Sequence, residues 1–231
     1  MKTKKKKIFI ALDTNKISKA KKIIKLSKTN KLDIGYKVGL ELFFSKGGRE
    51  FVSKVKNKNL FLDLKISDIE TTSSAAIRSL KDLRNVKYLT VHASSGEETL
   101  RRVVKTARQT NSKLRILVVT ILTSISNSSV KKIGHTRSIQ ELVKKQALLA
   151  KKCKAHGIVC AGPDLKFVRK VFKGEIFTPG IRLKGSSANE QKRILGPKEA
   201  FKNGATALVI GRSITKQNVK KNIKQLIEEL K

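Results

Sequence analysis

The 231-residue sequence has few aromatic and few acidic residues. Aromatic side chains make up 5% of the chain, and with no RNA-binding signature present this scarcity argues against a stacking surface for nucleic acid. The chain has only 17 acidic residues against 53 lysines and arginines, so its net charge is +36. Such an excess of positive charge ordinarily favours the binding of polyanions. The lysines occur in nearly every predicted helix and form no separate basic tail beyond Lys2–Lys7. We therefore assign the charge to solvated faces and expect no specific nucleic-acid partner.

Cysteines and long apolar runs are also scarce. The spacing of Cys153 and Cys160, the two cysteines of the chain, matches no zinc motif, so we expect reduced, structural thiols. No run approaches the roughly 18 apolar residues that a membrane span requires. The apolar stretch after the N-terminal lysines, Ile8–Leu12, is too short for a secretory signal and leads into Asp13. We expect a soluble, cytoplasmic protein with no membrane association.

Eight short β-rich runs alternate with amphipathic, helix-like segments. The runs are residues 8–13, 34–39, 60–65, 88–93, 115–122, 157–162, 175–181 and 207–214. The amphipathic segments include residues 17–27, 47–56, 73–83, 96–110, 138–154, 163–172 and 197–203. Apolar strands that alternate with helices indicate a parallel sheet covered by helices. Their number favours closure into a (β/α)8 TIM barrel, an α/β fold, and a doubly wound open sheet is the alternative.

No linker or low-complexity region divides the sequence. Because α/β barrels of this length commonly form one domain, we predict a single barrel domain over residues 1–231. A short basic N-terminal extension is expected at residues 1–7.

The segment LFLDLKISDIETT, residues 60–72, begins as an apolar strand and then places three charged residues within six positions: Asp63, Lys65 and Asp68. Because side chains alternate across a strand, Asp63 and Lys65 should leave the same face near its C-terminal end, where their charges interact. Asp68 follows where the strand gives way to a loop, so it either joins the pair or points at a neighbouring subunit. Taken alone, this pattern is explained equally well by ordinary solvated charges at a strand end.

Polar residues also stand at the ends of the other predicted strands. TIM barrels carry their active residues at the C-terminal ends of the strands, where the loops begin. The residues at these positions are Asp13, Lys37, Asp63, Lys65, His92, Thr123, Ser124, Arg182, Gly211 and Arg212. A structural role is the favoured interpretation for His92 alone, but the joint placement of the set predicts an active site.

The last two strand ends indicate a phosphate site. The run TPGIR supplies Arg182, and the Gly/Ser-rich loop that follows supplies Gln191. The run IGRSIT allows a ligand to approach the backbone at Gly211, beside Arg212. TIM barrels often hold phosphate at these loops, and the planar guanidinium of arginine suits phosphate oxygens. A plain strand-to-helix turn is the alternative for GRSI, but the two arginines together favour a phosphorylated substrate.

Eight motifs occur in a characteristic order between Ile8 and Thr215. They are ALD (11–13), YKVGLEL (36–42), DLKISDIETT (63–72), VHAS (91–94), VTILTS (119–124), TPGIR (178–182), EQKR (190–193) and VIGRSIT (209–215). Together they resemble the orotidine 5'-phosphate decarboxylase family. The resemblance implies a (β/α)8 homodimer with shared active sites and no metal or organic cofactor. It also implies decarboxylation of a nucleotide, orotidine 5'-monophosphate, to UMP in pyrimidine biosynthesis.

The resemblance further implies roles for the strand-end residues. A network of alternating charge would consist of Lys37, Asp63, Lys65 and Asp68, with Lys65 as the proton donor. Asp68 and Thr72 would reach into the site of the partner subunit. The substrate contacts would come from Asp13 and Lys37 to the ribose, from Thr123 and Ser124 to the pyrimidine, and from Arg182, Gln191, Gly211 and Arg212 to the phosphate.

Three places depart from the commoner bacterial pattern of the family. Ser67 stands where that pattern has His, Glu70-Thr71 stand in place of Pro-Asn, and Glu190 replaces Asp. None of these changes removes a charge from the network. We expect them to shift the rate or the affinity rather than the reaction.

Two other functions are compatible with parts of the sequence. Mg-dependent sugar-phosphate decarboxylases and aldolases of the same superfamily share the DxKxxD strand, but they carry an acidic, metal-associated residue in the second strand where this chain has Lys37. A polyanion-binding protein on a barrel scaffold is the alternative from a different class, because the fold alone does not determine function.

Overall fold

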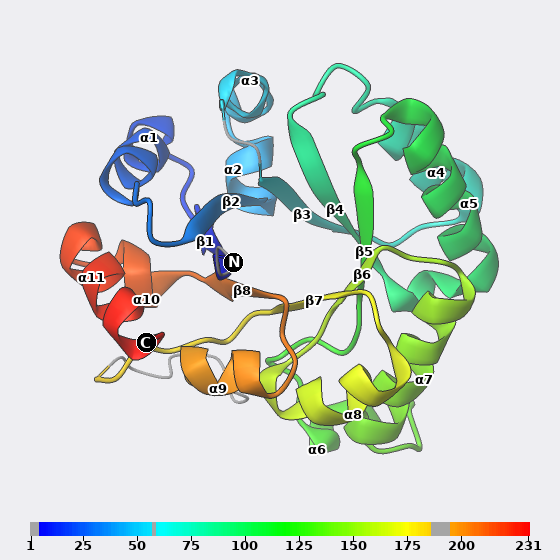
Figure 1. The fold of residues 1–231 in the computed structure, drawn as a ribbon. Coiled ribbons are helices and arrows are strands. Elements are labelled where there is room, and N and C mark those ends of the chain that lie inside the picture. The colour runs from blue at the N-terminus through cyan, green and yellow to red at the C-terminus, as the bar shows by residue number, and fades with distance from the viewer. Residues whose placement is uncertain (1–4, 57–58, 186–194) are drawn as a thin grey trace.

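The computed structural model describes residues 5–56, 59–185 and 195–231. Its eight strands form a closed parallel barrel in the order β1 to β8 (Figure 1). The strands are β1 (Lys7–Ala11), β2 (Asp33–Gly39), β3 (Leu60–Ile66), β4 (Val86–His92), β5 (Arg115–Val119), β6 (Gly157–Val159), β7 (Glu175–Thr178) and β8 (Ala207–Ile210). Each predicted β-rich run overlaps one of these strands, so the TIM barrel is confirmed and the open sheet is excluded.

Helices surround the barrel on the outside (Figure 1). They are α1 (Ile17–Leu26), α2 (Leu40–Phe44), α3 (Gly48–Lys54), α4 (Glu70–Arg78), α5 (Gly96–Thr110), α6 (Asn127–Lys132), α7 (Ile139–Lys152), α8 (Leu165–Val171), α9 (Pro197–Lys202), α10 (Arg212–Thr215) and α11 (Val219–Glu229), with 3-10 turns η1 (Ala93–Ser95) and η2 (Gly162–Asp164). Six of the seven predicted amphipathic segments contain a helix and the segment 73–83 overlaps α4, whereas α2, α6, α10 and α11 were not identified from the sequence. No helix of the described residues is long and apolar enough to cross a membrane.

Several strand boundaries predicted from the sequence differ from those of the structure, and the last strand differs most. The last β-rich run was expected to extend to residue 214, but β8 ends at Ile210 and α10 begins at Arg212. Gly211 interrupts the strand, and the buried Ile214 packs inward from a helix instead. The basic extension expected at residues 1–7 overlaps β1, because Lys7 is the first residue of that strand; residues 1–4 lie outside the described residues.

Apolar side chains fill two layers. The larger cluster lies between the strands and the helices, and both free cysteines, Cys153 and Cys160, are buried in it. The smaller cluster lies inside the barrel, where Phe9 meets the ring of Phe61 edge-on at 5.6 Å and that of Tyr88 at 5.5 Å. Such edge-to-face pairs are favourable beyond their buried area. This aromatic layer fills the inside of the barrel beneath the C-terminal ends of the strands.

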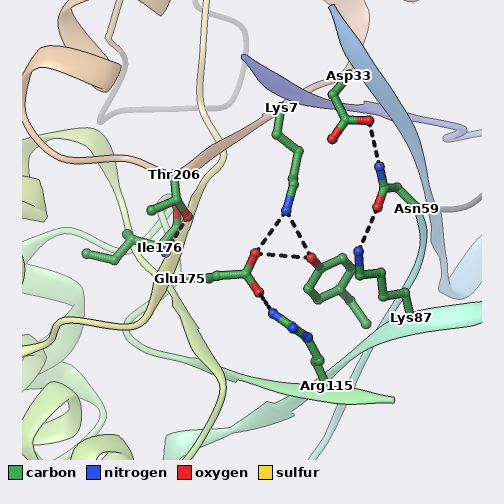
Figure 2. A network of polar contacts seen from close by, with 9 residues as sticks. Lys7, Asp33, Asn59, Lys87, Arg115, Glu175, Ile176 and Thr206 are labelled. Carbon is green, nitrogen blue, oxygen red and sulfur yellow. Dashed lines mark hydrogen bonds and ion pairs between the residues drawn. The ribbon is translucent and has the colours of Figure 1, made fainter. Parts of the chain in front are cut away.

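A polar network closes the N-terminal end of the barrel (Figure 2). Glu175 accepts hydrogen bonds through Oε1 from Lys7 Nζ at 2.9 Å and from Tyr88 OH at 3.1 Å. Its Oε2 accepts one from Arg115 Nη1 at 2.8 Å. Burial alone would raise the pKa of Glu175, but Lys7 and Arg115 outweigh it and hold the pKa below its ordinary value. The carboxylate thus ties the starts of β1, β5 and β7 to β4.

Candidate active site

A cavity of about 240 Å³ opens at the C-terminal ends of the strands. Eight residues predicted for the site line it, namely Asp13, Lys37, Asp63, Lys65, Thr123, Arg182, Gly211 and Arg212. A larger cleft of about 1000 Å³ lies between α1 and α3, but its lining includes none of these residues. The smaller cavity is the candidate active site because the strand-end residues converge there.

Four side chains of alternating charge form a row in the cavity. Lys37 Nζ lies 3.0 Å from Asp13 Oδ1 and 3.4 Å from Asp63 Oδ2. Lys65 Nζ lies 2.9 Å from the same Asp63 oxygen. Asp63 therefore contacts both ammonium groups, and it is also well shielded from water, with 12% of its side chain exposed. The predicted proximity of Asp63 and Lys65 is confirmed in this structure.

The row keeps its inner members ionised. Burial on its own would lower the pKa of Lys37, but the carboxylates of Asp13 and Asp63 outweigh it and raise that pKa above its ordinary value. Burial would likewise raise the pKa of Asp63, but Lys37, Lys65 and a hydrogen bond from Thr90 hold it below the usual range. Opposite charges at this distance favour the charged forms of both partners. The cavity thus holds fixed charges at neutral pH.

Thr90 holds this arrangement from the neighbouring strand. Its buried hydroxyl donates to Asp63 Oδ1 at 3.1 Å and accepts from the backbone N–H of Lys65 at 2.9 Å. The Lys65 backbone adopts a positive φ of 47°, a conformation that is uncommon for residues other than glycine. Sequence analysis missed Thr90. The available signal was a polar residue inside the apolar run YLTVHA, which is also typical of a core threonine.

The side of the cavity where the sequence predicts a phosphate site is built around two turns. Gly180 has a φ of 76°, which favours glycine, and it lies between β7 and Arg182. The backbone N–H of Arg182 donates to Leu195 O at 3.1 Å, and Leu195 N donates to Gly180 O at 3.3 Å. At the other turn, a Cβ added to Gly211 would lie 3.4 Å from Asp13 Oδ2. Both arginines line the cavity.

Other predicted site residues lie apart from the row. Asp68 and Thr72 are exposed, and the Asp68 carboxylate accepts a hydrogen bond from the backbone N–H of Ile69 at 2.7 Å. Ser124 is exposed and is not part of the cavity lining. Gln191 and Glu190 fall outside the described residues. The roles of these residues stay predictions.

His92 and Glu70 have structural partners. His92 Nδ1 lies 2.8 Å from Ser94 Oγ, and burial together with the Lys65 cation lowers the pKa of His92, which agrees with a structural role. Glu70 Oε1 lies 3.4 Å from Arg102 Nη2. This pair turns the extra negative charge of Glu70 toward α5.

Comparison with known proteins agrees with this geometry. The model of the Orotidine 5'-phosphate decarboxylase / HUMPS family matches residues 6–226. The chain belongs to this family. An Orotidine 5'-phosphate decarboxylase of Wolbachia sp. subsp. Brugia malayi is 40% identical over 227 residues, which cover 95% of this chain and 96% of the relative. One from Paramagnetospirillum magneticum is 38% identical over 220 residues, covering 90% and 91% of the two chains.

A solved structure has the same fold as this chain over nearly its whole length. The crystal structure of Orotidine 5'-phosphate decarboxylase from Lactobacillus acidophilus superimposes with a TM-score of 0.83 at 27% sequence identity. The match covers 97% of this chain and 99% of that one. Membership in the decarboxylase family is therefore supported by motifs, overall sequence and fold together.

Proposed function

We propose that this protein is an orotidine 5'-phosphate decarboxylase, a carboxy-lyase that converts orotidine 5'-monophosphate to UMP in pyrimidine biosynthesis. The observation that carries the proposal is the pairing of Lys65 with Asp63 in a cavity that Arg182 and Arg212 also line. This arrangement supplies an ammonium group for the reacting carbon and two guanidinium groups for a phosphate. The curated relatives described above bear the same enzyme name, and the sugar-phosphate alternative is not favoured.

The reaction needs electrostatic stabilisation at one carbon atom. When the bond from C6 of the pyrimidine to the carboxylate breaks, CO2 leaves and the electron pair stays on C6, where no aligned π-system receives it. The Lys65 ammonium stabilises this developing charge and then transfers a proton to C6, which gives UMP. Asp63 keeps Lys65 oriented through the 2.9 Å contact. A proton from solvent then restores the ammonium group.

The remaining polar groups orient the nucleotide. Asp13 and Lys37 contact the ribose, Thr123 and Ser124 the pyrimidine, and the phosphate is held by Arg182, Gln191, Gly211 and Arg212. Binding energy from the distant phosphate helps to order the site around the reacting carbon. Because the ammonium group performs both the stabilisation and the protonation, this mechanism requires no metal ion or organic cofactor.

The active form is a homodimer in our proposal, and the exposed surface around the site supports it. Leu40, Phe44 and Ile69 are 49%, 74% and 66% exposed. They follow the neighbouring strands β2 and β3, on the same edge of the barrel as the cavity. Large exposed apolar side chains beside a site are typical of a protein contact. Such a contact places the exposed Asp68 and Thr72 at the partner's cavity.

The whole chain acts as one barrel domain in this proposal, and it acts in the cytoplasm. The family match from residue 6 to residue 226 supports the single domain. A nucleotide is its only proposed ligand class, with no specific nucleic acid and no membrane among its partners.

The test is the loss of orotidine 5'-monophosphate absorbance, measured with and without EDTA. We expect the wild type to be active in both conditions and Lys65→Ala to lose turnover by a factor of at least about 1000, because charge stabilisation and protonation are lost together. UMP binding to Lys65→Ala should stay measurable by calorimetry. Lys105→Ala, a change at an exposed lysine of α5, is the matched control and should keep full activity.

Two outcomes would contradict the proposal. Near-normal turnover of Lys65→Ala would exclude Lys65 as the proton donor. An inactive wild type that becomes active on sugar phosphates with Mg²⁺ would transfer the assignment to the superfamily alternative.

A further inference from the structure

A second cleft adjoins the candidate active site. It has a volume of about 600 Å³ and lies between α1 and the α10–α11 segment, which are neighbours in Figure 1. Asp13 and Arg212 line both this cleft and the catalytic cavity, so the two spaces share a wall where the phosphate of the substrate is proposed to bind.

The second cleft is strongly cationic. Lys19 and Lys22 line it from α1, and Lys216 lines it from the residue after α10, where its backbone N–H donates to Arg212 O at 3.0 Å. All three lysines are exposed, and within the part of the chain that the structure describes no ion pair engages them. The sequence has no acidic residue from Thr14 to Leu32 or from Arg212 to Ile227. Among the described residues, Asp13 is the one acid that lines the cleft, and it is paired with Lys37.

The backbone that carries Lys216 is held in place. The side-chain amide of Asn222 donates to Ile214 O at 3.0 Å and to Lys216 O at 2.8 Å. Asn218 caps α11 by accepting from Lys221 N at 3.1 Å. The floor of the cleft is apolar, with Ile23 and Val219 among its lining residues. The cleft is therefore a shaped cationic space with a fixed rim.

We infer that this cleft binds the terminal phosphates of pyrimidine nucleoside 5'-di- and triphosphates whose first phosphate occupies the site at Arg212. This inference rests on the proposed function, because it requires UMP to bind in the catalytic cavity. The two spaces meet at Arg212, so a phosphate chain that extends from a bound UMP moiety past Arg212 enters the second cleft and gains cationic partners there. Phosphate oxygens suit the lysines and the arginine that meet there.

The consequence is competitive inhibition of the decarboxylase by uridine nucleotides. UDP and UTP place the same uridine moiety in the cavity and add contacts that the substrate, a monophosphate, does not make. They exclude the substrate without being turned over, because they carry no carboxylate at C6.

The experiment compares UMP, UDP and UTP by isothermal titration calorimetry in EDTA at one ionic strength. We expect UTP to bind the wild type about tenfold more tightly than UMP, the scale of two or three exposed charge pairs. The double variant Lys19→Ala/Lys216→Ala should reduce this ratio to within about twofold. Lys105→Ala/Lys144→Ala removes the same charge from exposed positions on α5 and α7 and should keep the wild-type ratio.

The outcomes separate the inference from the function on which it rests. UMP binding without tighter binding of UTP would overturn the inference alone. An equal loss of the ratio in the control variant would also overturn it, because general surface charge would then explain the effect. Failure of all three nucleotides to bind would overturn both the inference and the proposed function.

Discussion

Asp63 is the residue on which the proposed chemistry depends most, because one of its oxygens contacts two ammonium groups. Lys37 lies 3.4 Å and Lys65 lies 2.9 Å from Oδ2, so the carboxylate fixes the spacing of both cations. Its second oxygen is held by the Thr90 hydroxyl at 3.1 Å. Every oxygen of the carboxylate thus has a partner, as a largely buried charge requires. The orientation of Lys65 follows from that of Asp63.

Thr90 should influence the rate although it does not line the cavity. In Thr90→Val the shape of the side chain is nearly kept, but Asp63 loses a donor and the Lys65 N–H loses an acceptor. We expect kcat to fall by a factor of about 10 to 100, because a small displacement of the proton donor is costly to the rate. The measurement is steady-state kinetics on orotidine 5'-monophosphate.

A matched variant distinguishes this positioning role from general packing. Thr90→Ser keeps the hydroxyl and removes a methyl group, so it should retain most of the wild-type kcat while losing some stability. If Thr90→Val kept the wild-type kcat and Thr90→Ser did not, the hydroxyl would have no part in positioning Lys65.

At the scale of elements, an irregularity in β3 creates the site. Leu62 pairs with Leu89 and Ile66 with Val91, so the three residues from 63 to 65 face Thr90 alone. This bulge brings Asp63 and Lys65 together above Thr90, and it explains the positive φ of Lys65. Strand alternation correctly predicted that the two side chains meet. It could not predict the bulge or the role of Thr90, because both depend on the register against β4.

The turn after β7 is a second element whose geometry can be tested. Gly180 has a left-handed φ of 76°, and the turn that it forms positions Arg182. We expect Gly180→Ala to lower the free energy of unfolding by about 1–2 kcal/mol, the cost of that conformation for an L-residue. It should also raise KM for the phosphorylated substrate by displacing Arg182.

Gly134 supplies the control for that variant. It too has a positive φ, of 89°, but it is exposed after α6 and does not line the cavity. Gly134→Ala should therefore incur a similar loss of stability, measured by urea denaturation, with an unchanged KM. Equal KM values for both variants would show that the Gly180 turn has no part in substrate binding.

At the scale of the whole molecule, the few carboxylates hold both ends of the barrel. Asp63 stands at the C-terminal end between Lys37 and Lys65, and Glu175 stands at the N-terminal end between Lys7 and Arg115. The eight-strand pattern made the barrel predictable, and the strand-end residues include every charged residue that lines the cavity in the described part of the chain. The Glu175 network was not predictable, because its members lie far apart in the sequence and meet only when the barrel closes.

This network predicts that the free energy of unfolding falls at acidic pH. The pKa of Glu175 is lowered in the folded protein by Lys7 and Arg115, against the effect of burial. The contribution of the Glu175 charge to the free energy of unfolding is therefore fully present above the pKa of the unfolded chain, about 4.3. It is lost as the pH falls through the lower pKa of the folded protein. We expect Glu175→Gln to reduce the free energy of unfolding by about 2 kcal/mol at neutral pH, with the difference from wild type shrinking below about pH 4.

Denaturant unfolding at a series of pH values measures this difference. Glu228→Gln is the control, because Glu228 is exposed and paired only with Lys231 among the described residues. The free energy of unfolding of Glu228→Gln should follow that of the wild type at every pH. A difference between Glu175→Gln and wild type that stayed constant down to pH 3 would mean that the charge of Glu175 does not stabilise the fold.

The proposed dimer can be tested by mixing two inactive variants of the chain. If Asp68 completes the partner's site, a chain with Lys65→Ala still offers an intact Asp68, and a chain with Asp68→Ala still offers an intact Lys65. Random mixing of the two inactive variants makes half of the dimers mixed, and each mixed dimer has one complete site out of two. Activity should therefore return to about a quarter of the wild-type value.

Mixing Lys65→Ala with Asp63→Ala is the matched control. Asp63 and Lys65 contact each other within one chain at 2.9 Å, so every site in such a mixed dimer lacks one of the two. No activity should return in that mixture. Recovery in both mixtures would contradict the proposal, because no exchange of chains brings an intact Asp63 and an intact Lys65 of one chain together. Recovery in neither would confine Asp68 to its own chain. Recovery in the first mixture alone is the result that a site shared across a contact at Leu40, Phe44 and Ile69 requires.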